Sequence, residues 1–171
     1  MRFSGIFVVS SLIASAFALP TADFTPKLKA LTDLVKTSTV QVKNFDGSIS
    51  QFSDIDAGAQ MLAKATMASN MALMTFPPFN QVESSANLVA SEALVSGIES
   101  LSDSLIDKKP AFKKIGKVAA VENDARAVAG PAFSLMQGLI ERTPAGDKPK
   151  AKELQQRAIN KFAQLLKEFM N

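Results

Sequence analysis

Five long stretches of the chain place apolar residues at three- and four-residue steps, the spacing that gathers them on one face of an α-helix. Clusters of proline and glycine separate these stretches, and no segment shows sustained alternation of apolar and polar residues. Amphipathic helices bury their apolar faces against one another. The sequence therefore predicts an all-α fold, a single antiparallel bundle of about five long amphipathic helices with short connections.

Capping residues indicate where the first three helices begin. Thr25 precedes a proline and is expected to be an N-cap. Ser53 and Asp56, three residues apart, form a possible starting or internal cap of the second helix. Asn80 and Glu83 match a capping box, so the third helix should begin there.

Prolines indicate where helices end. Because proline lacks the N–H that a helix needs, Pro110 is expected to close the third helix, and Gly130–Pro131 to kink or split the fourth. The fourth helix should start at residue 111 or 117 and reach 142. A turn at residues 143–147 separates it from the fifth helix, and the two prolines within residues 76–79 form a stiff break.

The N-terminus has the pattern of a secretory signal peptide. Arg2 precedes an apolar run that ends in Ala16-Phe17-Ala18, so cleavage is expected before Leu19. The strongly apolar part is about 13 residues, short of the roughly 20 that span a bilayer, so we expect no transmembrane anchor. The predicted organisation is a signal peptide at residues 1–18 and a helical-bundle domain at 19–171, secreted from the cell.

Several residue types that carry chemistry are missing from the sequence. The chain has no Cys, His, Trp or Tyr, so a Ser-His-Asp triad, a cysteine nucleophile, an imidazole or thiolate zinc site and the usual haem ligands are all excluded. We therefore expect no enzyme, no cofactor and no metal. A carboxylate hydrolase remains as an alternative, although Asp54 and Asp56 should lie on different helix faces, and Asp103 and Asp107 resemble solvated charge.

Charge is distributed unevenly along the chain. Residues 19–106 carry 5 Lys and 9 acidic residues, whereas residues 107–171 carry 13 basic and 7 acidic residues. A basic half can indicate nucleic acid, but lysine predominates there and no Tyr or Trp is present to stack on bases. We expect a solvated lysine-rich helix face and no nucleic-acid partner.

The second helix has apolar residues on two sides. Its expected core stripe is opposed by Met67, Met71 and Met74, spaced i, i+4 and i+7. Packing between other helices is the simpler explanation; the alternative is that the methionines contact an apolar ligand, for which their flexibility suits them. Phe76 and Phe79 flank the double proline, where they either plug one end of the bundle, the interpretation we favour, or form an exposed wedge. These five residues are the candidate apolar lining of a ligand site.

The order of landmarks resembles a known family, the fungal hydrophobic surface-binding protein A group, which includes cell-wall galactomannoproteins. The sharpest landmark is the Lys-Lys-Pro-Ala-Phe run within residues 105–112, similar to the family's KKP-x-F pattern. An Asn-Phe-Asp-Gly turn at 44–47, Gly-Leu-Ile at 138–140 and Thr-Pro-Ala at 143–145 follow the family's order.

The resemblance implies a secreted all-helical protein that adsorbs to hydrophobic surfaces or holds a fatty acid inside its bundle. It also implies recruitment of secreted esterases and association with the cell wall. Two hypotheses follow: a module that binds lipids or hydrophobic surfaces, and alternatively a structural wall mannoprotein or secreted effector that binds a protein partner. A closed cavity and an adsorbing exterior remain distinct mechanisms for the first.

Overall fold

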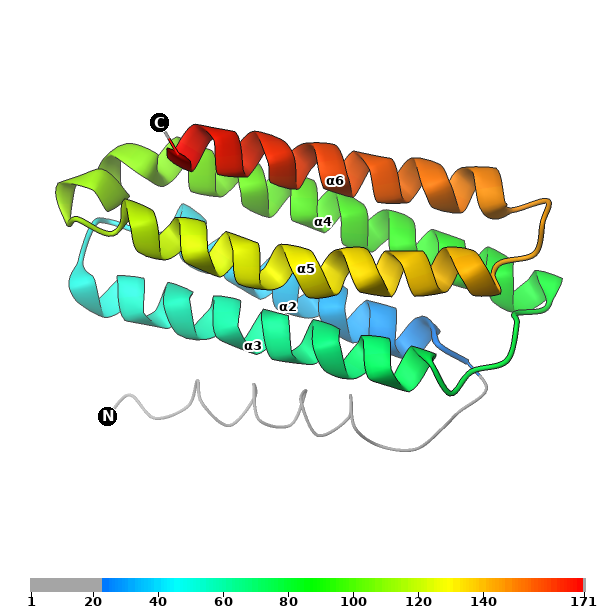
Figure 1. Ribbon diagram of the computed structural model, residues 1–171. Helices are drawn as coiled ribbons and strands as arrows, with labels where there is room; N and C mark the ends of the chain where they lie inside the picture. The colour runs from blue at the N-terminus through cyan, green and yellow to red at the C-terminus, as the bar shows by residue number, and fades with distance from the viewer. Residues whose placement is uncertain (1–22, 171) are drawn as a thin grey trace, which may run out of the picture.

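The computed structural model describes residues 23–170, and within them every regular element is an α-helix (Figure 1). The predicted all-α bundle of five long helices is thus confirmed. The expected signal peptide at 1–18 lies outside the described residues. The helices are α2 (Thr25–Lys43), α3 (Ile49–Leu73), α4 (Gln81–Lys114), α5 (Val118–Arg142) and α6 (Lys148–Met170).

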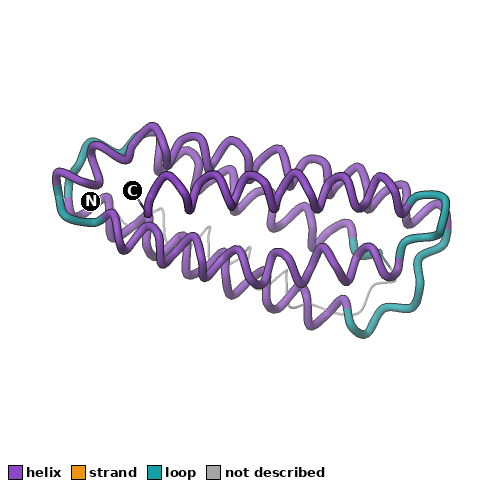
Figure 2. The backbone as a smooth tube through the Cα atoms, turned by 45° about the horizontal axis from the view of Figure 1, so that its top comes forward, coloured by secondary structure: helices purple, strands orange, loops and turns teal. Residues whose placement is uncertain are grey.

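The five helices run alternately up and down and close into a ring (Figures 1 and 2). Around the ring, α2 packs on α4, α4 on α6, α6 on α5, α5 on α3, and α3 again on α2. Across the ring only α4 and α5 touch, and marginally. No described helix therefore occupies the axis, and side chains from the surrounding helices must fill it.

Side-chain caps show where the helices begin. One helix begins where the sequence predicts, and others begin a few residues away. Asn80 accepts a hydrogen bond from the Glu83 backbone N–H, and the Glu83 carboxylate accepts one from the Asn80 N–H, so the capping box is confirmed. The prediction of Thr25 as an N-cap is wrong, because the helix already begins at this residue. The cap of α3 is Ser48, whose hydroxyl accepts from the Gln51 N–H at 3.3 Å.

The expected end of a helix at Pro110 and the expected split at Gly130–Pro131 are also wrong, whereas a kink at Pro131 stays a prediction. Pro110 lies inside α4, which continues to Lys114, and Pro131 lies inside α5. At Pro131 the preceding residue is Gly130, which has no Cβ to clash with the proline ring in a helical conformation. The sharp reversal comes at Gly116 instead, whose φ of 69° suits glycine and lets three residues join α4 to α5.

Two clusters of buried apolar side chains fill most of the ring. The larger includes Phe24 and Phe76, whose rings meet edge to face at 5.3 Å, and extends from the end where α3 ends and α4 begins to the middle of the bundle. The smaller lies at the opposite end around Phe112, which is fully buried and stacks on Phe45 at 4.6 Å. Aromatic side chains therefore close both ends of the bundle.

Candidate functional site

Among the described residues, three cavities follow one another along the interior of the ring. The largest, of about 60 Å³, has side chains of all five helices in its walls. A middle cavity of about 20 Å³ lies among α2, α3, α4 and α5, and an end cavity of about 20 Å³ lies among α4, α5 and α6. A volume of about 10–15 Å³ is enough for one water molecule, so all three are real gaps in the packing.

Neighbouring cavities share wall residues, which makes the three a series. Leu62, Ile98 and Val128 line both the largest and the middle cavity. Ser91 and Met136, among others, line both the middle and the end cavity. A small movement of such side chains joins neighbouring cavities into one apolar channel, and methionine changes shape most easily.

One carboxyl group, that of Asp124 on α5, lines the largest cavity, and it lies beside the carboxyl group of Asp56 on α3. Asp124 lines the cavity and is partly buried. Burial is the main reason that the pKa of Asp124 is raised to about 6, and the charge of Asp56 and a hydrogen bond to its carboxyl group contribute as well. Among residues 23–170, neither carboxylate forms an ion pair with lysine or arginine. This end of the cavity series is therefore acidic.

The acidic pair does not have the geometry of a glycosidase. Retaining glycosidases hold their carboxyl groups about 5 Å apart and inverting enzymes hold them farther apart, with the sugar between them. Asp56 and Asp124 approach closely enough to hydrogen-bond to each other. The pairs considered from sequence do not converge on the cavities either, since Asp54 is exposed and Asp103 pairs with Lys161.

The opposite end of the cavity series holds a buried amide. Asn87 lines the end cavity and is only 4% exposed. Its Oδ1 accepts a hydrogen bond from the Thr25 hydroxyl at 3.1 Å. Its Nδ2 is the one fully buried side-chain nitrogen or oxygen within residues 23–170 that has no hydrogen-bond partner there.

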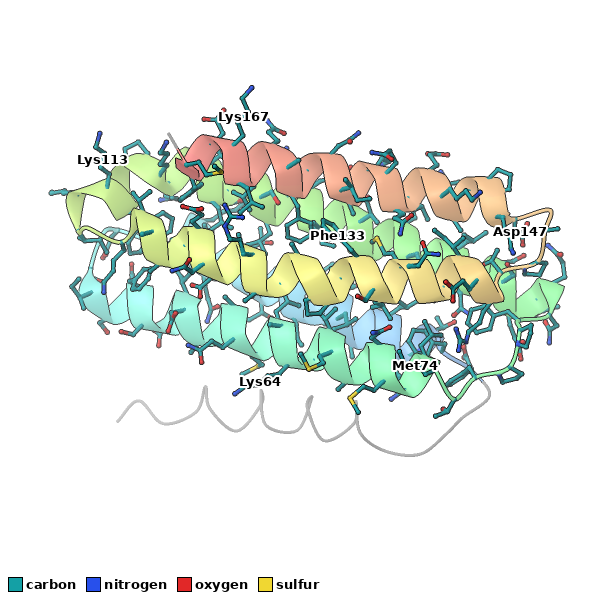
Figure 3. The ribbon with its side chains drawn as sticks, in the orientation of Figure 1. Lys64, Met74, Lys113, Phe133, Asp147 and Lys167 are labelled. Carbon is teal, nitrogen blue, oxygen red and sulfur yellow. The ribbon has the colours of Figure 1, made fainter. Side chains whose placement is uncertain are left out.

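The five candidate residues predicted from sequence fall into two groups, three exposed methionines and two buried phenylalanines. Met67, Met71 and Met74 are 55%, 65% and 68% exposed. Figure 3 shows Met74, with Lys64, on the outer side of α3. The favoured packing of these methionines between helices is wrong, because α3 is a wall of the ring with one side to solvent. Phe76 and Phe79 are buried and plug one end of the bundle. None of the five lines the three cavities described above.

Sequence reasoning missed both polar groups of the interior. Asn87 falls on the same helix face as Ser84 and Ser91, a polar interruption in the apolar stripe of α4 that could have marked it. No comparable signal marks Asp124, because its partner lies on another helix and only the fold brings the two together.

Charged side chains join α4 to α6 on the outside of the ring. Arg157 makes two hydrogen bonds to Glu99, at 2.8 and 3.0 Å, and also pairs with Glu92. The hydrogen bond from Arg157 is the main reason that the pKa of Glu92 lies below its ordinary value.

Among the described residues, there is no group of three acidic side chains placed to hold a metal ion. Over the same residues, no helix combines the length and hydrophobicity needed to cross a membrane.

Comparison with known proteins gives one family and several similar structures. The family described as hydrophobic surface binding protein A matches residues 21–140. No curated protein matches significantly. AfMP4p in complex with palmitic acid is 18% identical, with a TM-score of 0.81 over 94% of this chain and 99% of that one.

Two ligand binding domains of the Penicillium marneffei MP1 protein are similar to the same degree. Domain 1, complexed with arachidonic acids, is 19% identical, with a TM-score of 0.81 over 85% of this chain and 95% of that one. Domain 2, complexed with multiple arachidonic acids, is 20% identical, with a TM-score of 0.77 over 99% of this chain and 98% of that one. At these identities the likeness shows a common fold.

Proposed function

The chain belongs to the hydrophobic surface binding protein A family, and from this premise we propose that it is a secreted, non-catalytic protein that binds long-chain lipids such as fatty acids inside its helical ring. The observation that carries the proposal is the series of apolar cavities along an axis that no described helix occupies. Three structures of the same fold, from two proteins, are complexes with fatty acids, which supports this ligand class.

Binding requires the ring to widen. The largest cavity, at about 60 Å³, is far smaller than the engineered cavities of about 150 Å³ that accept benzene. An acyl chain must therefore push side chains and helices apart. Each Å² of apolar ligand surface that leaves water contributes about 25 cal/mol, which offsets the cost of this rearrangement.

Native mass spectrometry of the protein purified from its secreting host tests the proposal directly. We expect a mass increment equal to one or more fatty acids, lost on extraction with organic solvent. Recovery of lipid-free protein that also fails to take up added palmitic acid would refute it. Specific capture of one wall or host protein without lipid would support the alternative, a structural mannoprotein or a protein-binding effector.

A matched pair of variants locates the ligand. Ala59 lines the largest cavity, whereas Ala57 on the same helix is exposed. Ala59→Phe fills the space and is expected to reduce palmitic acid uptake strongly, at a folding cost of about 1–3 kcal/mol. Ala57→Phe should leave uptake unchanged. Equal uptake by both variants would place the lipid elsewhere.

A second mechanism, adsorption of the exterior, is favoured by the exposed stripe of Met67, Met71 and Met74. An apolar surface that covers these side chains removes them from water, and full burial of a methionine contributes about 1.5–3 kcal/mol. Replacing all three with glutamine should abolish retention on hydrophobic beads. The control replaces Val82 and Val89, which are 80% and 74% exposed on α4, with threonine. Equal retention of both variants would exclude the methionine stripe as the adsorbing surface.

Recruitment of a secreted esterase and association with the cell wall are further proposals from the family resemblance. An esterase partner would be expected to contact the protein on an outer helix face while the interior holds lipid. Co-purification from culture fluid tests the esterase proposal. A hydrolase should remain bound to the protein both when the protein carries lipid and after the lipid has been removed.

A further inference from the structure

The unpaired amide hydrogen of Asn87 is unusual for a buried polar group. A buried donor without a partner loses its hydrogen bonds to water and gains nothing in return. Thr25 satisfies only the oxygen of this amide, so the NH2 group is left pointing to no acceptor among the described residues. A leucine at this position would avoid the penalty. The retained amide suggests that an acceptor arrives from outside the chain.

The position of Asn87 tells where that acceptor lies. Asn87 is a wall residue of the end cavity, together with Ser91, which also lines the middle cavity. Along α4 the cavities continue as far as Leu105, and at 1.5 Å per residue the rise from Asn87 to Leu105 is about 27 Å. A bilayer's hydrocarbon core of about 30 Å holds two acyl chains end to end, so one chain of about 15 Å fits within that length.

The two ends of the cavity series have opposite preferences for a charged group. A hydrogen-bond donor without a partner attracts a carboxylate at the Asn87 end. The paired carboxyl groups of Asp56 and Asp124 repel a carboxylate at the other end. The walls between them are apolar, with Leu62, Ile98 and Val128 at the junction of the two larger cavities.

We propose that Asn87 Nδ2 anchors the carboxylate of a long-chain fatty acid, whose acyl chain runs along the ring axis towards Asp124. The inference rests on the proposed function and adds to it the direction of the ligand and the residue that selects its head group. Asn87 acts as a hydrogen-bond donor to the carboxylate, and Thr25 positions the amide by holding its oxygen.

The test compares two ligands of the same chain length, palmitate and hexadecylamine, by calorimetric titration of delipidated protein at pH 7.5. The wild-type chain is expected to prefer palmitate. Asn87→Leu should weaken palmitate binding by about 10- to 100-fold, the loss expected for one hydrogen bond to a charged group, and leave hexadecylamine binding unchanged. Asn87→Asp, of the same shape, should weaken palmitate binding further and reverse the preference.

Thr25→Val is the matched control. It removes the same Thr25–Asn87 hydrogen bond but keeps the Nδ2 donor, so it should retain the preference for palmitate. The inference is overturned if Asn87→Leu and Asn87→Asp keep the wild-type affinity for palmitate. It is also overturned if Asn87→Leu and Thr25→Val weaken both ligands equally, since Asn87 then only supports the fold. A wild-type chain that binds neither ligand refutes the proposed function itself.

Discussion

Replacing Asp124 with asparagine should stabilise the protein at neutral pH and not at acidic pH. The pKa of Asp124 is about 6 in the folded chain, against an ordinary value of 3.8. Between these pH values the folded state keeps a proton that the unfolded chain releases. The favourable contribution of protonated Asp124 is thus complete below pH 3.8 and is lost as the pH rises through 6.

The size of the effect follows from the shift. Two pKa units correspond to roughly 3 kcal/mol at about 1.36 kcal/mol per unit. Because Asp124 is partly exposed, solvent screening reduces this to about 1–2 kcal/mol. Asp124→Asn removes the charge, so the variant should exceed the wild type in stability by that amount at pH 7.5 and match it near pH 4.

Urea unfolding followed by circular dichroism at pH 4 and pH 7.5 measures the difference. Other carboxylates titrate in both proteins, so subtracting the two curves isolates Asp124. The control is Asp54→Asn, which removes an exposed carboxylate from α3 and should leave the pH profile unchanged. A wild type more stable than Asp124→Asn at pH 7.5, or an equal difference at both pH values, would refute the reasoning.

Four further substitutions test the packing and one helix cap, each by urea or thermal unfolding. Gly138→Ala should cost about 1–3 kcal/mol, because the added Cβ would lie 2.9 Å from Cδ2 of the buried Leu73. Gly58→Ala should instead gain up to about 1 kcal/mol of helix propensity, since its near neighbour is the flexible end of a glutamine side chain; a loss as large as that of the first variant would contradict this. Phe112→Ala should cost about 3–5 kcal/mol, because it removes a fully buried ring that contacts three others; a loss below 1 kcal/mol would show that the cluster repacks freely. Asn80→Ala should cost about 1 kcal/mol by breaking the capping box, and no loss would mean that α4 starts equally well without it.

Local sequence signals predicted the helices well, because they depend on neighbours along the chain. The capping box at Asn80 and Glu83 and the periodicity of the five segments are such signals, and both were confirmed. Proline at 110 and 131 misled the prediction, because the penalty for proline in a helix is smaller than the energy of burying the residues that follow it. The family resemblance was confirmed by the match over residues 21–140.

The candidate site was predicted less well, because it depends on how the helices close. Periodicity shows that α3 has two apolar sides but not whether a neighbour covers the second side. The ring leaves Met67, Met71 and Met74 exposed, and whether they bind a surface stays a prediction. The acidic pair arises only where α3 and α5 meet, so neither Asp56 nor Asp124 could be singled out from its own helix.

The phenylalanine clusters at the two ends have a consequence for the kinetics of the protein. Because aromatic side chains close both ends of the bundle, a ligand cannot enter or leave along its axis. It must pass between two neighbouring helices that separate transiently. Separating packed helices has a large activation enthalpy. The rate of ligand exchange should therefore be low in the cold and rise steeply with temperature, whatever the affinity for the ligand.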